Sequence, residues 1–299
     1  FVSTPKPRYH PHPQHHPGQH MTTTATTAEE HFIDAGEIET HYWESGSGSP
    51  LVLIHGGGAG ADAWGNWAPL MATFASQFRT IALDMVGFGR SRVRGNSDGF
   101  EYSQDARVSH LKAFLDAVGL EQVSLIGNSM GGATALGLAM TEPARVKTLV
   151  LMGSAGLNRA FSPQLQTILN YREPNRDDMA RIVGALTHES FVPADDLVDY
   201  RYKLTCDPVV MDAYRRTMAW VREHGGLHYA EDDIASVSVP TLVVSGREDA
   251  VVPLLESVRF HQLIEESRLY AIPRCGHWAM IEHPAEFARV SLDFLLSQG

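Results

Sequence analysis

The chain has 299 residues, 24 Lys and Arg against 35 Asp and Glu, a formal net charge of −11 with neutral histidines, and an isoelectric point near 5.7. This acidic excess argues against a nucleic-acid-binding protein, because such proteins use basic side chains to neutralise phosphates. With 43% hydrophobic and 20% charged residues, the composition is that of a globular protein rather than a disordered or fibrous one, and the length allows one large domain or two small ones.

Residues 1–20 differ in composition from the rest of the chain. They contain five of the 15 histidines and five of the 16 prolines, and they have no acidic residue and no hydrophobic periodicity. Segments of this kind cannot bury enough apolar surface to fold, so we predict a disordered tail. Met21 is typical of a natural start, which favours added purification sequence over a histidine-rich metal-binding tract.

From Met21 onward, short apolar runs alternate with helical patterns. This alternation predicts an α/β fold with a mostly parallel central sheet that helices flank on both faces. The expected strands are residues 40–44, 51–54, 79–83, 123–126, 146–152, 241–245 and 268–272. The expected helices lie near residues 64–76, 103–118, 130–141, 254–264 and 284–296.

Residues 155–235 interrupt the alternation. This segment has no buried-strand run, and its pattern is helical and amphipathic with several aromatic side chains. An insertion of this length between two core strands is typical of a lid over an active site. We therefore predict a core from residues 21–154 and 236–299 and an inserted helical lid at 155–235. A helical subdomain that only adds stability is the alternative.

Two features bear on where the protein works. The charge-free run at residues 122–141 is long enough to test as a membrane span, but it contains Asn128, Ser129 and four glycines, so it favours a strand, a turn and a helix. Only two cysteines occur, and no secretory leader is in view. These observations favour a cytoplasmic protein that does not bind membranes.

The sequence Gly-Asn-Ser-Met-Gly at residues 127–131 fits the G-x-S-x-G pattern. It directly follows one expected strand and directly precedes an expected helix. In that context the serine occupies a strained turn, which lifts its hydroxyl above the sheet edge at a helix N-terminus. Ser129 is therefore a candidate nucleophile. The alternative is a glycine-rich turn that binds nothing or binds a phosphate.

A second glycine-rich stretch follows the expected strand 51–54. Its sequence is His55-Gly56-Gly57-Gly58, and three successive glycines leave backbone N–H groups unobstructed. Such groups can stabilise a tetrahedral oxyanion, and the Met130 N–H would supply the second donor. His55 is interpreted as a structural hydrogen-bonding residue rather than as a base.

A nucleophilic serine needs a base, and the base needs an acid that orients it. Asp249 and His277 each follow an expected strand, so both lie where the carboxyl ends of parallel strands meet. The chain order Ser129, Asp249, His277 is that of the α/β-hydrolase triad. Glu248 is the alternative acid, and Asp249 is preferred because its shorter side chain lies further along the loop. Cys275 is interpreted as a packed residue.

Several motifs together resemble the meta-cleavage-product hydrolases of the α/β-hydrolase superfamily. They are GNSMGGATAL at 127–136, the glycine-rich loop with WGN at 64–66, DMVGFGRS at 84–91, and CGHW at 275–278 with Glu282-His283. The similarity runs from about residue 51 to residue 294 and weakens in the expected lid. It implies hydrolysis of a carbon–carbon bond in 2-hydroxy-6-oxohexa-2,4-dienoates. The products would be a carboxylic acid and 2-hydroxypenta-2,4-dienoate, and neither a cofactor nor a metal would be needed.

The resemblance also implies roles for single residues. Ser129, Asp249 and His277 would form the triad, and Gly57 with Met130 would form the oxyanion hole. The implied substrate-binding residues are Gly58, Asn66, Asn128, Arg201 and Trp278. Ala59 stands where the family often has proline. A homo-oligomer, a dimer or larger, is expected as well.

Arg201 has two interpretations. A planar guanidinium can hold a carboxylate through two parallel hydrogen bonds, and a lid arginine would bring it to the substrate when the lid closes. Alternatively, it is a solvated lid charge near Asp196 and Asp199.

Other functions are compatible with the same triad. A carboxylesterase or lactonase needs no carboxylate clamp, so Arg201 with Asn66 and Asn128 would discriminate between the two enzyme classes. A ligand receptor without useful turnover is a further alternative. Haloalkane dehalogenases and epoxide hydrolases are disfavoured, because they carry aspartate at the position of Ser129.

Overall fold

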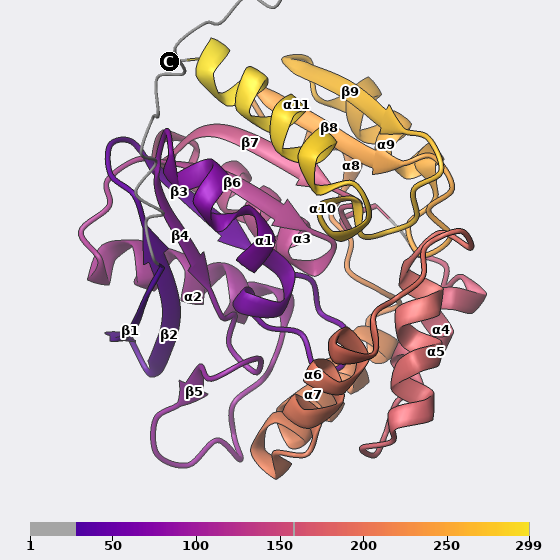
Figure 1. Ribbon diagram of the computed structural model, residues 1–299. Helices are drawn as coiled ribbons and strands as arrows, with labels where there is room; N and C mark the ends of the chain where they lie inside the picture. The colour runs from indigo at the N-terminus through magenta and orange to yellow at the C-terminus, as the bar shows by residue number, and fades with distance from the viewer. Residues whose placement is uncertain (1–27, 158, 299) are drawn as a thin grey trace, which may run out of the picture.

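The computed structural model describes residues 28–157 and 159–298, and a nine-stranded sheet lies at their centre (Figure 1). The tail predicted at residues 1–20 lies outside the described residues. The strands are β1 (Glu29–Ala35), β2 (Ile38–Ser45), β3 (Pro50–Ile54), β4 (Arg79–Leu83), β5 (Arg92–Val93), β6 (Val123–Asn128), β7 (Val146–Met152), β8 (Thr241–Gly246) and β9 (Ser267–Ile272).

Eleven α-helices and one short 3₁₀ helix connect these strands within the described part of the chain. They are α1 (Ala63–Ala75), α2 (Gln104–Ala117), α3 (Met130–Thr141), the 3₁₀ helix η1 (Pro143–Arg145), α4 (Pro163–Leu169), α5 (Arg176–Leu186), α6 (Asp195–Thr205), α7 (Pro208–Glu223), α8 (Glu231–Ala235), α9 (Leu254–Leu263), α10 (Ala279–Glu282) and α11 (Pro284–Ser297).

The sheet is mostly parallel, which confirms the predicted fold class. The strand order is β1-β2-β4-β3-β6-β7-β8-β9, and β5 pairs with β2. Every neighbouring pair from β4 to β9 is parallel, whereas β2 is antiparallel to β1, β4 and β5. Because both faces of a parallel sheet are covered, its strands read as continuous apolar runs. This burial explains why β3, β6, β7 and β8 are recognisable from sequence.

Strand β1 was not predicted, and its burial pattern gives the reason. Four of its seven residues are exposed, and only Ala35 is buried. Its sequence therefore lacks an apolar run, and its structure depends on backbone pairing with β2, in a register from Glu29 opposite Glu44 to Ala35 opposite Ile38. Pairing of this kind is set by a neighbouring strand rather than by local periodicity.

Helices cover both faces of the sheet (Figure 1). Helices α1, α10 and α11 lie on one face, and α2, α3, α8 and α9 lie on the other. Side-chain caps mark two of the helix starts that the sequence predicted: Asp62 accepts a hydrogen bond from Gly65 N at α1, and Ser103 accepts one from Ala106 N at α2. Within the described residues, no helix is both long enough and apolar enough to cross a bilayer.

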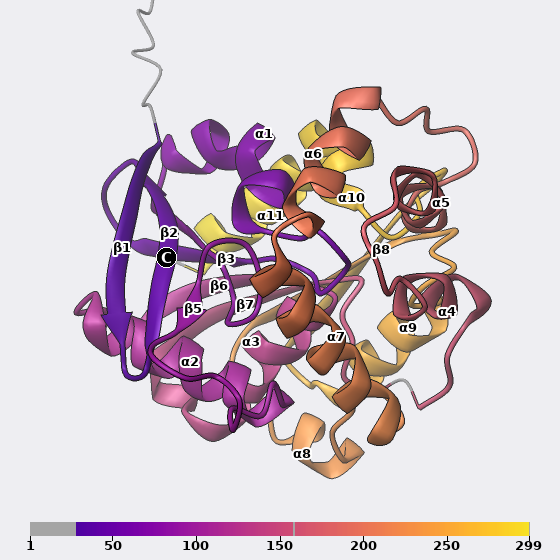
Figure 2. The same ribbon diagram turned by 90° about the horizontal axis from the view of Figure 1, so that it is seen from below.

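Helices α4–α7 stand apart from these two layers (Figure 1). Seen from below, α6 and α7 lie in front of the central strands (Figure 2). Helix α6 also packs against α1 and α5. Helix α8, which ends the inserted segment, instead packs against α3 and α9 of the core.

Two buried histidines hold the turn after β4 in place. His55 Nε2 accepts a hydrogen bond from Met85 N (3.0 Å), and His110 Nδ1 accepts one from Val86 N (3.1 Å). The opposite ring nitrogens bond Gly56 O (2.7 Å) and Thr40 Oγ1 (2.7 Å). A ring nitrogen that accepts from an N–H carries no proton, so this geometry requires both rings to be neutral. It agrees with the interpretation of His55 as a structural residue.

This geometry predicts acid sensitivity. Burial lowers the pKa of His110 from 6.5 to about 3. As the pH falls below 6.5, the unfolded chain binds a proton that the folded chain excludes, so the free energy of unfolding decreases until the pH approaches 3. In His110→Gln, we expect the pH slope of the unfolding free energy in this window to fall by on the order of 1 kcal/mol per pH unit. Urea titrations at several pH values measure the slope, and equal slopes in the two proteins would contradict a neutral His110.

Candidate active site

Ser129 lies in the sharp turn between β6 and α3. Its φ of 54° and ψ of −115° make it one of two described non-glycine residues with positive φ. The turn is fixed on both sides, because Ser129 N donates to Met152 O (3.0 Å) and Ser129 O accepts from Ala155 N (3.1 Å). A Cβ at Gly131 would collide with the carbonyl oxygens of β3 and the residue after it, so only glycine lets α3 begin this close to the sheet. Strain held in this way is typical of functional sites.

The glycine-rich loop after β3 faces this turn. Gly57 and Gly58 are half-buried, and the side chain of Met130 packs against Gly57. Met130 is the first residue of α3, where backbone N–H groups have no partner inside the helix. The two residues predicted for the oxyanion hole are therefore adjacent, beside the positive end of a helix dipole.

Asp249 and His277 form a buried pair. Asp249 Oδ2 lies 2.7 Å from His277 Nδ1, and the two residues are 5% and 2% exposed. The other carboxylate oxygen of Asp249 accepts from Val251 N (2.8 Å) and Val252 N (2.9 Å), which fixes the orientation of the group. The alternative acid, Glu248, is exposed and accepts from Cys275 N (3.2 Å) instead.

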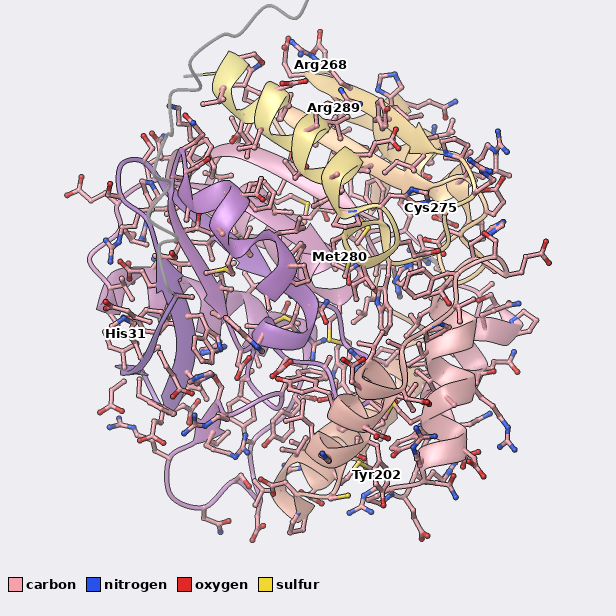
Figure 3. The ribbon with its side chains drawn as sticks, viewed as in Figure 1. His31, Tyr202, Arg268, Cys275, Met280 and Arg289 are labelled. Carbon is pink, nitrogen blue, oxygen red and sulfur yellow. The ribbon has the colours of Figure 1, made fainter. Side chains whose placement is uncertain are left out.

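Glu282 holds the loop that carries His277. Its carboxylate accepts from the backbone N–H groups of Gly276 (3.0 Å) and Trp278 (3.2 Å), one on each side of the histidine, and from His188 N (2.7 Å). Sequence reasoning missed this role, because backbone contacts of a glutamate leave no local pattern. Cys275 in the same loop is buried (Figure 3), and burial raises the pKa of its thiol, which confirms the interpretation as a packed residue.

Ser129 and His277 line a cavity between the sheet and helices α4–α7. One group of lining residues is polar. It comes from the loop after β3, the start of α1, the sharp turn around Ser129 between β6 and α3 (the nucleophile elbow), and α6: Gly57, Gly58, Asn66, Asn128 and Arg201. The other group is apolar and comes mainly from α4, α7 and the following loop: Leu165, Ile168, Leu169, Met218, Val221 and Leu227. All the predicted site residues except Asp249 line this cavity.

Arg201 is buried in the polar part of the cavity. Its side chain is 1% exposed, its Nη2 donates to Ala59 O (2.8 Å), and its guanidinium stacks on Trp278 at 4.8 Å. Among the described residues, Nε and Nη1 have no hydrogen-bond partner. Burial lowers its pKa to about 10. The interpretation as a solvated charge near Asp196 and Asp199 is wrong, because Arg201 is buried, and Asp199 pairs with Arg176 instead.

Asn66 and Asn128 complete the polar part. Asn66 Nδ2 donates to Asn128 Oδ1 (3.4 Å), and Asn128 Nδ2 donates to Met152 O (3.2 Å). Within the described chain, Asn66 Oδ1 is buried and unpartnered. Buried polar atoms that lack partners are costly, so several of them around one space indicate that a polar ligand completes the site.

Comparisons with known proteins agree with this geometry. The family profile for the alpha/beta hydrolase fold matches residues 49–284. A 2-hydroxy-6-oxo-6-(2'-aminophenyl)hexa-2,4-dienoic acid hydrolase of Metapseudomonas resinovorans is 46% identical over 89% of this chain and 90% of its own. A 2-hydroxy-6-oxo-2,4-heptadienoate hydrolase of Pseudomonas putida is 38% identical over 88% and 95%.

A solved structure is similar along nearly its whole length. It is a meta-cleavage product hydrolase from Pseudomonas fluorescens IP01, a serine-to-alanine mutant in complex with acetates. The TM-score is 0.83 at 31% sequence identity, and the match covers 91% of this chain and 98% of that one.

Proposed function

The chain belongs to the meta-cleavage-product hydrolases of the α/β-hydrolase superfamily, and from this membership we propose the bond that it cleaves and the residues that cleave it. The substrate is a 2-hydroxy-6-oxohexa-2,4-dienoate, a ring-fission product of aromatic degradation. Water is added across the C5–C6 bond, which releases 2-hydroxypenta-2,4-dienoate and a carboxylic acid.

One observation carries the substrate assignment. Arg201 is a buried guanidinium with two unpartnered nitrogen atoms, and it lines the same cavity as Ser129 and His277. A buried cation of this kind favours an anionic ligand, and its planar fork matches a carboxylate. The dienoate carboxylate would bind Arg201, and the 2-oxygen would bind Asn66 and Asn128. The C6 carbonyl would then lie at Ser129, with its oxygen toward the Gly57 and Met130 N–H groups.

The first chemical step is a proton transfer. The 2-hydroxyl loses its proton while C5 gains one, so the dienol becomes a 2,6-diketone that can accept electrons. His277 is the proposed shuttle, because Asp249 holds its Nδ1 and leaves Nε2 for proton transfer. Asp249 also stabilises the imidazolium that forms when Nε2 takes a proton.

The second step breaks the carbon–carbon bond. Ser129 Oγ, or a water that it activates, gives up a proton to His277 and attacks C6, and the resulting oxyanion is stabilised by the two N–H donors. Collapse of this intermediate cleaves C5–C6 and moves the electron pair into the 2-oxo-enoate, which becomes a dienolate. The dienolate takes the proton from His277 and leaves as 2-hydroxypenta-2,4-dienoate, so His277 is neutral again. If Ser129 attacks directly, water then hydrolyses the acyl-enzyme.

The apolar part of the cavity supports a finer assignment of the C6 group. Among the described lining residues, only Arg201 and His277 have ionisable side chains, and both are committed to other parts of the substrate. The cavity therefore offers no second cation for a charged C6 group, and its leucines, Met218 and Val221 suit a flat apolar ring. We propose that the preferred substrate has an uncharged aryl group at C6.

A substrate series tests this assignment. We expect kcat/KM for a C6-phenyl dienoate to exceed that for a C6-methyl dienoate by roughly 10- to 100-fold, because the ring buries more apolar surface. A C6 group with a second carboxylate should be worse than phenyl by at least about 100-fold, because the charge would be buried without a partner. Loss of the yellow dienolate absorbance measures the rates. A carboxylate substrate as fast as phenyl would reject the aryl assignment.

p-Nitrophenyl esters provide the test of the esterase alternative. Fast dienoate turnover with slow ester cleavage supports the carbon–carbon hydrolase. Fast ester cleavage with slow dienoate turnover would support the same triad but reject a role for Arg201 in binding the substrate. Rapid multiple turnover of either substrate would exclude a ligand receptor.

We also propose that α4–α7 form a lid over the site, because the cavity lies between them and the core. A cytoplasmic location is proposed from the two free cysteines, Cys206 and Cys275. A homo-oligomer stays a prediction, which size-exclusion chromatography with light scattering would test.

A further inference from the structure

Asp62 connects two helices that meet at the polar part of the cavity. Its Oδ1 accepts from Gly65 N (2.7 Å) and so caps the first turn of α1. Its Oδ2 accepts from the hydroxyl of Tyr200 on α6 (2.5 Å). The carboxylate is 7% exposed, so both bonds are sheltered from water.

Each of these contacts is adjacent to a residue proposed to bind the carboxylate or the 2-oxygen of the substrate. Asn66 directly follows Gly65 on α1, and Arg201 directly follows Tyr200 on α6. One carboxylate therefore sets the position of α1 relative to α6 at the two residues that must meet a single ligand. The proposed catalytic residues Ser129 and His277 lie on other elements.

The loop before α1 and the first turn of α1 are shaped to receive α6. A Cβ at Gly65 would lie 2.8 Å from the Tyr200 ring, and a Cβ at Gly60 would collide with the backbone carbonyl of Arg201. Gly60 also has a φ of +64°, which disfavours any larger residue. Glycine at these two positions therefore allows the close approach of α6 to the loop and to the first turn of α1.

Asp62 also provides the nearby negative charge for the buried guanidinium. Burial lowers the pKa of Arg201 to about 10, and the negative charge of Asp62 opposes part of this lowering. Because its two oxygens bond Gly65 N and Tyr200, Asp62 offsets the charge without covering Arg201 Nε and Nη1. Both donors stay available for a ligand.

We propose that Asp62 and Tyr200 are positioning residues that hold Arg201 and Asn66 at the spacing of the substrate carboxylate and the adjacent 2-oxygen. This inference rests on the proposed function, because it concerns the binding of the same carboxylate. It predicts that the Asp62–Tyr200 bond acts on substrate binding through Arg201.

Tyr200→Phe is the sharpest variant, because it removes one hydroxyl and keeps the ring against Gly65. We expect KM for the C6-phenyl dienoate to rise by about 10- to 30-fold with a much smaller change in kcat, because a hydrogen bond to a charged group is lost. Hydrolysis of neutral p-nitrophenyl butyrate should change far less. Tyr202→Phe on the same helix is the matched control (Figure 3), since the Tyr202 hydroxyl interacts with Cys206 rather than with Asp62.

Asp62→Asn is the second variant. Asparagine is as good an N-cap as aspartate, so the start of α1 should be kept while the negative charge is lost. We expect the same selective rise in KM for the dienoate. An unchanged thermal midpoint would show that the effect does not come from unfolding.

A double-mutant cycle separates positioning from general structure. In an Arg201→Met background, adding Tyr200→Phe should change KM for the dienoate by less than about twofold, because the residue through which it acts is gone. If the changes in KM caused by the two single substitutions multiply in the double variant, the proposal is overturned. A Tyr200→Phe protein whose dienoate KM equals that of the wild type would also overturn it.

The proposed function fails in a different way. If the wild-type protein does not turn over dienoates, the function and this inference both fall. If the wild type is active and Arg201→Met selectively loses dienoate turnover, but Tyr200→Phe and Asp62→Asn do not raise KM, only the positioning role is rejected.

Discussion

Ser129→Ala is expected to lower kcat by about 10⁴- to 10⁶-fold on dienoates and on p-nitrophenyl esters alike, because the triad acts as a unit. Both reactions need the same attack on a carbonyl carbon, so no choice of substrate should rescue the variant. Steady-state assays measure the loss of kcat, with the variant purified so that traces of wild-type enzyme do not account for the remaining rate. Retention of most of the activity on either substrate would reject the elbow assignment.

Ser154→Ala is a suitable control for this variant. Ser154 is a buried serine close to the elbow, and its hydroxyl donates to Ala155 O (2.7 Å) rather than facing the cavity. It does not line the cavity, so its loss should affect stability more than turnover. Circular dichroism and thermal midpoints of both variants would separate loss of the nucleophile from loss of the fold.

Replacing Arg201 with methionine should change activity and stability in opposite directions. The substitution keeps an unbranched, flexible side chain and removes the donors for the substrate carboxylate. We expect kcat/KM on the C6-phenyl dienoate to fall by roughly 10²- to 10³-fold, as for a buried charged hydrogen-bonding group. Cleavage of p-nitrophenyl butyrate should fall far less, because that substrate has no carboxylate. Equal losses on both substrates would reject the clamp.

The stability of the same variant provides an independent measurement. A buried guanidinium with two unpartnered nitrogen atoms opposes folding, and an apolar side chain of similar size does not carry this cost. We therefore expect the thermal midpoint of Arg201→Met to equal or exceed that of the wild type, by up to about 5 °C. A large decrease would mean that Arg201 stabilises the fold through its bond to Ala59 O, its stacking on Trp278 or its attraction to the buried Asp62.

Arg201→Lys separates charge from geometry. Lysine keeps the positive charge but cannot form two parallel hydrogen bonds to a carboxylate. We expect it to recover only a small part of the dienoate activity that methionine loses. Full activity of Arg201→Lys would mean that charge alone binds the substrate.

Much of this protein is determined by short stretches of its sequence. The apolar runs of β3, β6, β7 and β8 predict buried parallel strands, and glycines on either side of Ser129 predict the elbow. Asp249 and His277 follow strands whose carboxyl ends meet, so their pairing at 2.7 Å follows from the topology. These features depend on local periodicity, on turn residues and on chain order, which are all present in the sequence.

Other features were decided only by tertiary structure. Nothing local distinguishes the buried Arg201 from the exposed charges around it, because its burial results from α6 packing against a loop about 140 residues earlier in the chain. The bond of Asp62 to Tyr200 and the bonds of Glu282 around His277 also join residues far apart in sequence or use backbone N–H groups. Side-chain periodicity reports which face of an element is buried but not which partner covers it. The proposed triad could therefore be named from the sequence, whereas the contacts that shape its pocket required the packed molecule.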